Sequence, residues 1–455
     1  MQKKPDGTRQ KLIALGSGRL VDALLELAAR NAEVADLVER MVASPKENVS
    51  RFKSKLAALK RRRRFIGWSE SSAYARELID LLGDLKAGVE DPKLGAELVA
   101  AFYQTDQSIF EQCDDSNGSI GDVFRHDARE LFVHYAAQCD EKAWLTRLVL
   151  QVSEQDDYGV RDTLVNCASA FLPEPCLRDL ADRFWQLGGQ ETEDYRQRHW
   201  TLLVESVARQ IKDAPLFEKA RRQAWPELPI AACIDIAEVY FDTGEAETAL
   251  AWLKRIPADE SFKADERDQL LIKVFGSLGN QQAATEFAWR IFRRHRSEKN
   301  LATLLSLIGE DQRDKVIMDE SVLIQDSASL SYSDVTFLLQ AGRVSDAERY
   351  LLTHKDQLNG DLYYTLLPLA EAMEQAGRLL VVSLIYRALL DSILRRAQSK
   401  YYHHGIRYLK KLENLAPGIA DWGKSSSHGD YFSELRQAHG RKSSFWSRYS
   451  QEESV

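Results

Sequence analysis

Residues 418–425 (GIADWGKS) fit the phosphate-binding pattern GxxxxGK[ST]. In a true phosphate-binding loop, which lies between a strand and a helix, backbone amides and the lysine contact the phosphate oxygens. Here the residues before Pro417 have a helical pattern, and 30 residues follow Ser425. That length is too short for the rest of a nucleotide-binding sheet and a magnesium-binding aspartate. We therefore predict that the segment is a linker between two helices.

Residues 113–120 (CDDSNGSI) are similar to the middle of a calcium-binding EF-hand loop, with Asp115 and Asn117 at ligand positions. The first and last ligand positions of such a loop would be Cys113 and Phe124, and neither side chain has the oxygen that calcium requires. We interpret the segment as a turn before a helix whose first residues include acidic side chains.

One predicted helix carries potential metal ligands at four-residue spacing, namely Asp122, His126, Glu130 and His134. The apolar residues between them define the face that enters the core; they are Phe124, Ala128, Leu131, Phe132 and Tyr135. We predict that the polar set is a solvent-exposed face. No HExxH motif and no Ser/His/Asp or Cys/His arrangement marks a nucleophile, so we expect neither an enzyme nor a bound cofactor or metal.

Cations mixed with aromatic residues form the remaining candidate, a surface for an anion or a partner. This candidate surface comprises Arg61, Arg62, Arg63, Arg64, His403, His404, Arg407, Lys410, Lys411, His428, Arg436, His439, Arg441, Lys442 and Trp446. Cations suit phosphate contacts and aromatic rings suit base stacking, so one interpretation is a nucleic-acid surface. The other is structural: residues 60–64 complement the negative end of a helix dipole, and the C-terminal set caps the end of a helical array.

The net charge of −8 is unevenly distributed along the chain. Residues 51–64 carry eight basic and no acidic side chains, and residues 392–449 carry eleven basic and four acidic ones. The rest of the chain therefore has a charge of −23. The two cationic segments could attract an anionic partner, or they could contact the acidic body of the same or another copy.

The elements that position these residues are predicted to be helices. Helical periodicity is nearly continuous, and alternating strand patterns are scarce. One clear helix start is Ser44-Pro45-Lys46-Glu47, where Ser44 can cap the helix and Glu47 completes a capping box. The 455 residues exceed the roughly 250–300 residues of a single core, so we expect several domains or an elongated array.

The second half of the chain contains a repeat centred on glycine. An apolar residue lies four positions before each glycine, and a small or β-branched residue lies five positions after it. The four sets are Tyr240, Gly244 and Ala249; Phe275, Gly279 and Ala284; Leu338, Gly342 and Ala347; and Met373, Gly377 and Val382. A degenerate unit surrounds Gly309. The pattern predicts stacked helical hairpins, an α-solenoid that resembles tetratricopeptide repeats over residues 230–395 or a less regular solenoid.

We expect four segments along this all-α chain. They are an N-terminal helical segment at 1–64 that ends in the basic run, an irregular helical array at 65–227, tetratricopeptide-like repeats at 228–416, and a basic, aromatic-containing cap at 417–455. No apolar run approaches the roughly 18–20 residues that span a bilayer, and the N-terminus has no run of signal-peptide length. The five cysteines are widely spaced without a CxxC pair. We therefore expect a cytoplasmic protein.

Two stretches carry a resemblance to a known family. They are residues 401–449, which include HHGIRYLKKL and HGRKSSFW, and residues 110–132. Together they resemble an uncharacterised bacterial family, a domain of unknown function. A similar helical tail occurs in bacterial proteins with a SWIM-type zinc finger, which needs CxC followed by CxH. Neither motif exists here, so the resemblance implies no zinc site and only an association with nucleic-acid proteins.

These observations lead to two functional expectations. The first is a non-enzymatic helical-repeat scaffold that binds a protein partner on a concave helical surface. The alternative is a nucleic-acid-associated protein that uses the basic segments 51–64 and 392–449.

Overall fold

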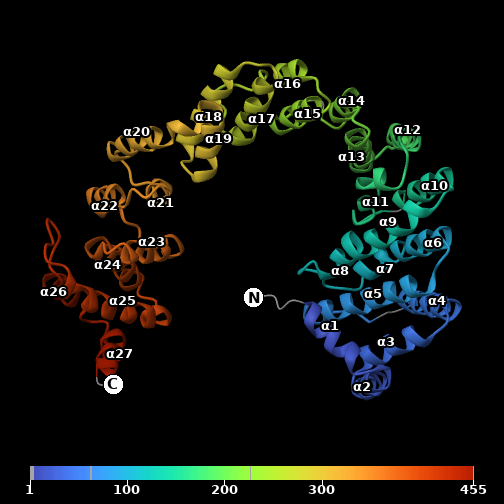
Figure 1. The fold of residues 1–455 in the computed structure, drawn as a ribbon, viewed down its shortest axis with the longest axis horizontal. Helices are drawn as coiled ribbons and strands as arrows, with labels where there is room; N and C mark the ends of the chain where they lie inside the picture. The colour runs from blue at the N-terminus through green and yellow to red at the C-terminus, as the bar shows by residue number, and fades with distance from the viewer. Residues whose placement is uncertain (1–4, 62–63, 155, 226, 454–455) are drawn as a thin grey trace. The chain divides into compact units, whose positions relative to one another are not determined.

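The structure, a computed structural model, describes residues 5–61, 64–154, 156–225 and 227–453, and it is all-helical (Figure 1). These residues include no β-strand, and a single isolated bridge pairs Ile66 with Cys113. The predicted all-α class is therefore confirmed. Within the same ranges, no helix is both long and apolar enough to cross a membrane.

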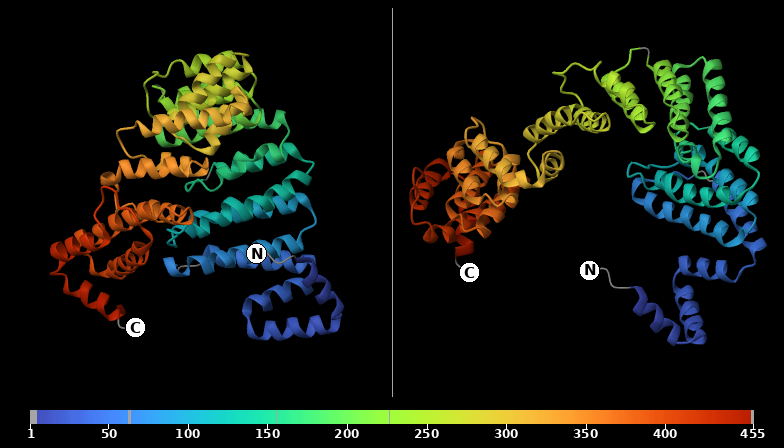
Figure 2. Two further views of the ribbon diagram at one scale, coloured as in Figure 1. Left: turned by 60° about the vertical axis from the view of Figure 1, so that its left-hand side comes forward. Right: turned by 45° about the horizontal axis from the view of Figure 1, so that its top comes forward.

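The chain divides into two compact units, Met1–Ala258 and Asp259–Val455, called unit 1 and unit 2 below. Within each unit, helices pack mainly on their neighbours in the sequence, and consecutive helices lie side by side (Figures 1 and 2). The division into four segments made from the sequence is finer than this and stays a prediction.

The elements of unit 1 are α1 (Pro5–Ala14), α2 (Ser17–Arg30), α3 (Ala32–Val42), α4 (Pro45–Arg61), α5 (Trp68–Gly88), α6 (Pro92–Tyr103), α7 (Asp106–Phe110), α8 (Ser119–Asp122), the π-helical η1 (Val123–Ala128), α9 (Arg129–Gln138), α10 (Lys142–Ser153), α11 (Asp162–Asn166), the 3₁₀ turn η2 (Ala168–Ala170), α12 (Glu174–Gln190), α13 (Asp194–Gln210), α14 (Ala214–Ala224), α15 (Ile230–Asp242) and α16 (Ala246–Leu253).

The elements of unit 2 are α17 (Ala264–Ser277), α18 (Gln281–Arg294), α19 (Glu298–Ile308), η3 (Glu310–Gln312), α20 (Arg313–Gln325), α21 (Tyr332–Gln340), α22 (Val344–Thr353), η4 (Lys355–Gln357), α23 (Tyr363–Gln375), α24 (Leu379–Arg396), η5 (Ser399–Tyr401), α25 (Tyr402–Leu415), η6 (Ala416–Gly418), α26 (His428–His439) and α27 (Ser443–Glu453).

The capping box predicted at the start of α4 is present. The backbone N–H of Ser44 donates to Oε2 of Glu47 at 2.7 Å, and the N–H of Glu47 donates to Oγ of Ser44 at 3.4 Å. Each bond satisfies a backbone donor that the first turn of a helix leaves unpaired. These hydrogen bonds also lower the pKa of Glu47.

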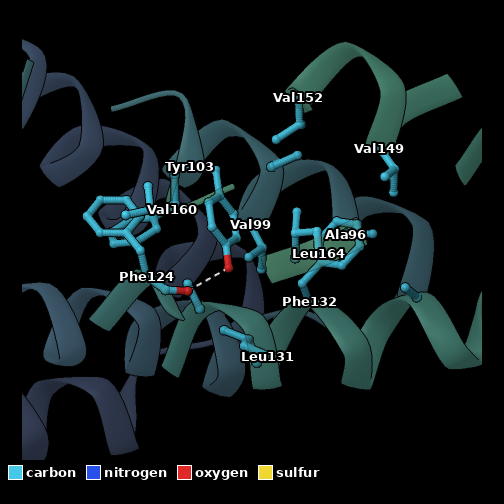
Figure 3. Close-up of a cluster of buried hydrophobic side chains, with 14 of the residues drawn as sticks. Ala96, Val99, Tyr103, Phe124, Leu131, Phe132, Val149, Val152, Val160 and Leu164 are labelled. Atoms are coloured by element: carbon cyan, nitrogen blue, oxygen red, sulfur yellow. Dashed lines mark hydrogen bonds between the residues drawn. The ribbon is translucent and has the colours of Figure 1, made fainter. Parts of the chain in front are cut away.

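A core of aromatic and aliphatic side chains lies between α6, η1, α9 and α10 of unit 1 (Figure 3). The hydroxyl of Tyr103 donates to the backbone oxygen of Phe124 at 2.6 Å, and both side chains are fully buried. The rings of Phe102 and Phe124 stack with centroids 4.9 Å apart. Tyr103 can be buried here because its one polar group has a partner.

The repeat glycines end the first helix of each hairpin, as predicted. At the end of α17, Gly279 has a φ of 71°, and the N–H of Asn280 donates to the oxygen of Phe275 at 2.9 Å. In this Schellman arrangement, the backbone oxygen of the residue four positions before the glycine accepts the closing hydrogen bond. The same bond joins Glu245 to Tyr240, Arg343 to Leu338, and Arg378 to Met373.

The small residue five positions after each glycine is buried between the paired helices. Ala249, Ala284, Ala347 and Val382 all have an exposed fraction of 0%. Gly309 differs, since its φ and ψ of 103° and 137° lie outside the left-handed helical region. The burial of these four side chains agrees with the predicted register, and Gly309 departs from it.

Candidate functional site

The segment that matches the phosphate-binding pattern lies in a loop between two helices and has no flanking strand. It begins in η6 and ends before α26. Nζ of Lys355 donates to the backbone oxygen of Lys424 at 3.1 Å and to Oγ of Ser425 at 3.0 Å. Two of its backbone donors are used within the loop, since the N–H of Gly423 donates to Oδ1 of Asp421 at 2.8 Å and that of Ser425 donates to the oxygen of Trp422 at 2.9 Å. These two donors are therefore not available to cradle a phosphate. The prediction of a linker is confirmed.

Arg387 of α24 also contacts this loop. Its Nη1 donates to the backbone oxygen of Ser426 at 2.9 Å, and the guanidinium lies 4.8 Å from the ring centre of Trp422 and 4.5 Å from that of Tyr431. Arg387 is 7% exposed, and burial lowers its pKa. A cavity of about 420 Å³ beside it is lined by four cations and two carboxylates, so its charge is mixed.

The residues that are similar to an EF-hand form a turn that caps α8. The two carboxylate oxygens of Asp115 accept hydrogen bonds from the N–H groups of Ile120 and Gly121, both at 2.8 Å. Gly118 has a φ of 74°, which the turn requires. The carboxylate is used for backbone capping, as the turn interpretation predicts.

The predicted polar face is solvent-exposed. It runs along α8, η1 and α9 with its four members, Asp122, His126, Glu130 and His134, exposed. The apolar residues opposite them enter the core of unit 1, as predicted.

The N-terminal basic segment is partly neutralised within unit 1. Nζ of Lys55 lies 2.8 Å from Asp36 and 2.9 Å from Asp84, and Nε of Arg40 also lies 2.9 Å from Asp84. Asp84 is fully buried. The two carboxylates neutralise Lys55, whose side chain is 39% exposed, so Lys55 is not a free cation.

The structure describes two of the four candidate arginines at residues 61–64, and both are exposed. Arg61 is exposed and donates through Nε to the backbone oxygen of Ala57. Arg64 is exposed and pairs with Glu70 at 2.5 Å. Arg62 and Arg63 lie outside the described residues.

The C-terminal candidates lie on α25, α26, α27 and the adjoining turns. Exposed residues are His403, Arg407, Arg436 and Arg441, and partly buried ones are His404, Lys410, Lys411, His428, His439 and Lys442. Lys411 pairs with Glu374 at 2.5 Å. Trp446 is 5% exposed, and the guanidinium of Arg436 covers its ring at 3.9 Å from the centroid. Trp446 therefore belongs to the core of unit 2, and its ring is not available for stacking at the surface.

One cavity brings two of the candidates together, and we call it the tyrosine–arginine pocket. It has a volume of about 260 Å³ and lies between α23, α24 and α25. Its polar lining consists of Tyr363, Arg396, Gln398, Tyr401, His404, Arg407 and Tyr408. His404 and Arg407 were predicted from the sequence, whereas Arg396 and the three tyrosines were not. Tyr363, Arg396 and Tyr401 come from other elements, and Tyr408 lies one turn after His404 on α25.

The two predicted members of the tyrosine–arginine pocket contact each other. Nη2 of Arg407 lies 3.4 Å from Nδ1 of His404. Arg407 has only donors, so this bond requires a neutral imidazole with its lone pair on Nδ1. Burial lowers the pKa of His404, and the charges of His403 and Arg407 lower it further. The neutral form is thus the one that the site favours.

Gly360 forms a backbone wall shared by this pocket and the mixed-charge cavity. A Cβ atom at this position would lie 1.9 Å from the backbone oxygen of Ala388. Only glycine permits this close approach of the chain to α24.

Fold and site together define an all-helical protein with a cationic, tyrosine-rich pocket in its C-terminal unit. The chain belongs to the family of unknown function DUF6880, whose family model matches residues 7–226 and 192–448. No curated protein matches the chain.

Proposed function

We propose that this chain is a non-enzymatic scaffold that binds a partner protein through the apolar face of its N-terminal helices. We also propose that its stacked hairpins form an α-solenoid in the cytoplasm, with tetratricopeptide-like geometry in unit 2. The support for this geometry is the repeat of glycine caps and buried small residues described above.

The observation that carries the proposal is the uncovered apolar face of α2. None of the residues described in α2 is buried. Its apolar side chains Val21, Leu25 and Leu27 are 51%, 54% and 55% exposed. On the neighbouring α3, Met41 and Val42 are 65% and 79% exposed. Uncovered apolar patches of this kind mark interaction sites.

The chemistry of α2 indicates what kind of partner it binds. Leu20, Leu24, Leu27 and Ala28 lie at three- and four-residue spacing, which a helix places on one face, and Val21 and Leu25 lie beside them. Its charges balance, with two arginines against Asp22 and Glu26. Because the charges cancel, apolar burial dominates, and the complementary surface is an amphipathic helix of another protein.

A photo-crosslinking amino acid at Val21 of the full-length protein tests this proposal in the cells that make it. We expect one dominant partner peptide with apolar residues at three- and four-residue spacing. The double substitution Leu25→Glu and Leu27→Glu should abolish the crosslink without changing the helical circular dichroism, because both side chains are exposed. A crosslinker at Tyr195, which is 71% exposed on α13, is the control position.

Three outcomes contradict the proposal. The crosslink could be absent, or the double substitution could leave it unchanged. The chain could also crosslink only to a second copy of itself. In that case the apolar face mediates self-association and does not bind a different protein.

The alternative function, nucleic-acid association through residues 51–64 and 392–449, has specific support as well. Arg61, Arg407 and Arg441 are exposed cations. Against it stands the pairing of Lys55 and Arg51 with carboxylates of unit 1, which reduces the charge available to a polyanion. We therefore rank it second.

A further inference from the structure

We propose that the tyrosine–arginine pocket binds a small planar aromatic anion of the nucleoside monophosphate class. The pocket lies in unit 2 and uses none of the apolar N-terminal helices, so this proposal goes beyond the scaffold function and is independent of it.

The charge of the pocket selects an anion. Two guanidinium groups line it, and no aspartate or glutamate is among the described residues that do so. Arg396 pairs with Asp361 outside the lining, with Nε 3.6 Å from Oδ1. Arg407 has no carboxylate partner among the described residues and contacts only the imidazole of His404 and the ring of Tyr408. An arginine in this state is free to bind a phosphate through two parallel hydrogen bonds.

The aromatic walls select a planar ring. Tyr363 and Tyr401 are 42% and 39% exposed. Tyr364 packs on the Tyr363 ring with centroids 4.0 Å apart, and Nζ of Lys400 lies 4.8 Å from the centre of the Tyr401 ring, so each ring has a neighbour on one side. Tyr408 is 5% exposed, and within the described part of the chain its hydroxyl has no hydrogen-bond partner. Stacking on tyrosine faces is favourable for every base, and a phenol hydroxyl can donate to a polar ring edge or a sugar hydroxyl.

The remaining lining supports the same ligand. Leu367, Leu389 and Ile393 form an apolar part of the wall, which suits a ring and excludes water from it. The volume of about 260 Å³ is near the lower limit of roughly 300 Å³ for small-molecule sites, so the pocket fits one ligand. A single-stranded polymer instead requires a groove that follows its backbone over several nucleotides.

Isothermal titration calorimetry on the full-length protein tests the proposal with four probes: AMP, adenosine, ribose 5-phosphate and inorganic phosphate. We expect AMP to bind with one site per chain. Adenosine lacks the anion, and ribose 5-phosphate and phosphate lack the ring, so each should bind at least about tenfold more weakly.

Three variants locate the site. Arg407→Gln removes the free cation and Tyr401→Ala removes an exposed ring, and each should weaken AMP binding at least about tenfold. Both side chains are exposed, so neither change should prevent folding, and thermal melts check this. Arg349→Gln removes an exposed cation of the same unit outside the pocket, with a side chain that is 66% exposed, and should leave AMP binding unchanged.

The result that overturns the proposal is any of the following. AMP fails to bind at millimolar concentration, ribose 5-phosphate binds as well as AMP, or Arg407→Gln binds AMP as tightly as the unmodified chain. Binding of a single-stranded oligonucleotide without binding of AMP also overturns it, and would support the nucleic-acid alternative instead.

Discussion

The guanidinium of Arg161 donates two hydrogen bonds to the carboxylate of Asp106, through Nη2 at 2.5 Å and Nε at 2.8 Å. The two side chains are only 3% and 1% exposed, so the pair lies in the interior of unit 1. A third bond, from Nη1 to the backbone oxygen of Val152 at 3.1 Å, leaves the cation well satisfied. The pair links α7 to the turn before α11.

Breaking this pair should strongly destabilise unit 1. Replacing Arg161 by methionine leaves the carboxylate of Asp106 buried without a cation, and we expect the free energy of unfolding to fall by about 3–5 kcal/mol. Chemical denaturation measures this change. Arg183→Met is the control, because Arg183 is 57% exposed in its pair with Asp179, and exposed pairs contribute about 0–1 kcal/mol. Equal effects of the two substitutions would contradict the role of the buried pair.

The buried alanine of the first repeat should not tolerate a large polar side chain. Ala249→Gln introduces volume and an amide between α15 and α16, and we expect a loss of about 1–3 kcal/mol in the free energy of unfolding. Glu247→Gln, on the exposed side of α16, is the matched control. Unchanged stability of Ala249→Gln in a denaturant titration would disprove the register.

Two glycines at the end of α17 should respond to alanine with opposite signs. Gly279 has a φ of 71°, so Gly279→Ala should cost about 1–2 kcal/mol of backbone strain. Gly276 is helical, and a Cβ atom there would meet nothing within 4 Å, so Gly276→Ala should stabilise by about 0.4–1 kcal/mol. Melting temperatures of the two variants provide the measurement, and a stabilising Gly279→Ala would exclude the cap geometry.

The stability of unit 1 should depend on pH through Glu205. Burial raises its pKa from an ordinary 4.5 to about 7, although Nη2 of Arg221 lies 2.9 Å from the carboxylate. The folded state therefore holds this proton more tightly than the unfolded chain, and the contribution to stability is full below about pH 4.5 and falls as the pH rises to about 7.

Glu205→Gln removes this titration. Relative to the unmodified protein, the variant should gain about 2–3 kcal/mol in the free energy of unfolding between pH 4.5 and pH 8. Denaturant titrations at the two pH values measure it. Glu238→Gln on α15, where the side chain is 51% exposed, should show no such change. A difference that shrinks with rising pH would reverse the assigned direction.

Salt dependence tests whether the basic segments bind nucleic acid or have only a structural role. If they bind duplex DNA, the logarithm of the affinity should fall with the logarithm of salt concentration with a slope of about −0.9 per phosphate contacted. Arg441→Glu should weaken that binding without lowering the melting temperature, because Arg441 is exposed. If no gel shift occurs even at low salt, the nucleic-acid alternative is wrong.

The sequence predicted the features that depend on neighbours along the chain. The glycine of a Schellman cap, the alanine five residues later and the capping box at Ser44 all follow from local backbone geometry, which is why their positions were readable. The exposed face at His126 followed from helical periodicity for the same reason.

The tertiary contacts of the sites could not be predicted from the local sequence. Tyr363 and Tyr401 join His404 in one pocket only because α23, η5 and α25 pack together, and no spacing in the sequence encodes that approach. Asp84 is another example, because an aspartate in a helical pattern looks like any exposed acid until Arg40 and Lys55 are brought to it by packing.

The anchoring of the loop before α26 has a consequence for how this family can evolve. Lys355 and Arg387 bind backbone oxygens of Lys424 and Ser426, which every amino acid provides. Substitutions along this glycine- and serine-rich loop therefore leave those two contacts intact, whereas an insertion or deletion moves the oxygens out of reach. Among relatives, the length of the loop between α25 and α26 should therefore vary less than its amino-acid sequence. Arg387 should be retained in the relatives that retain this loop length.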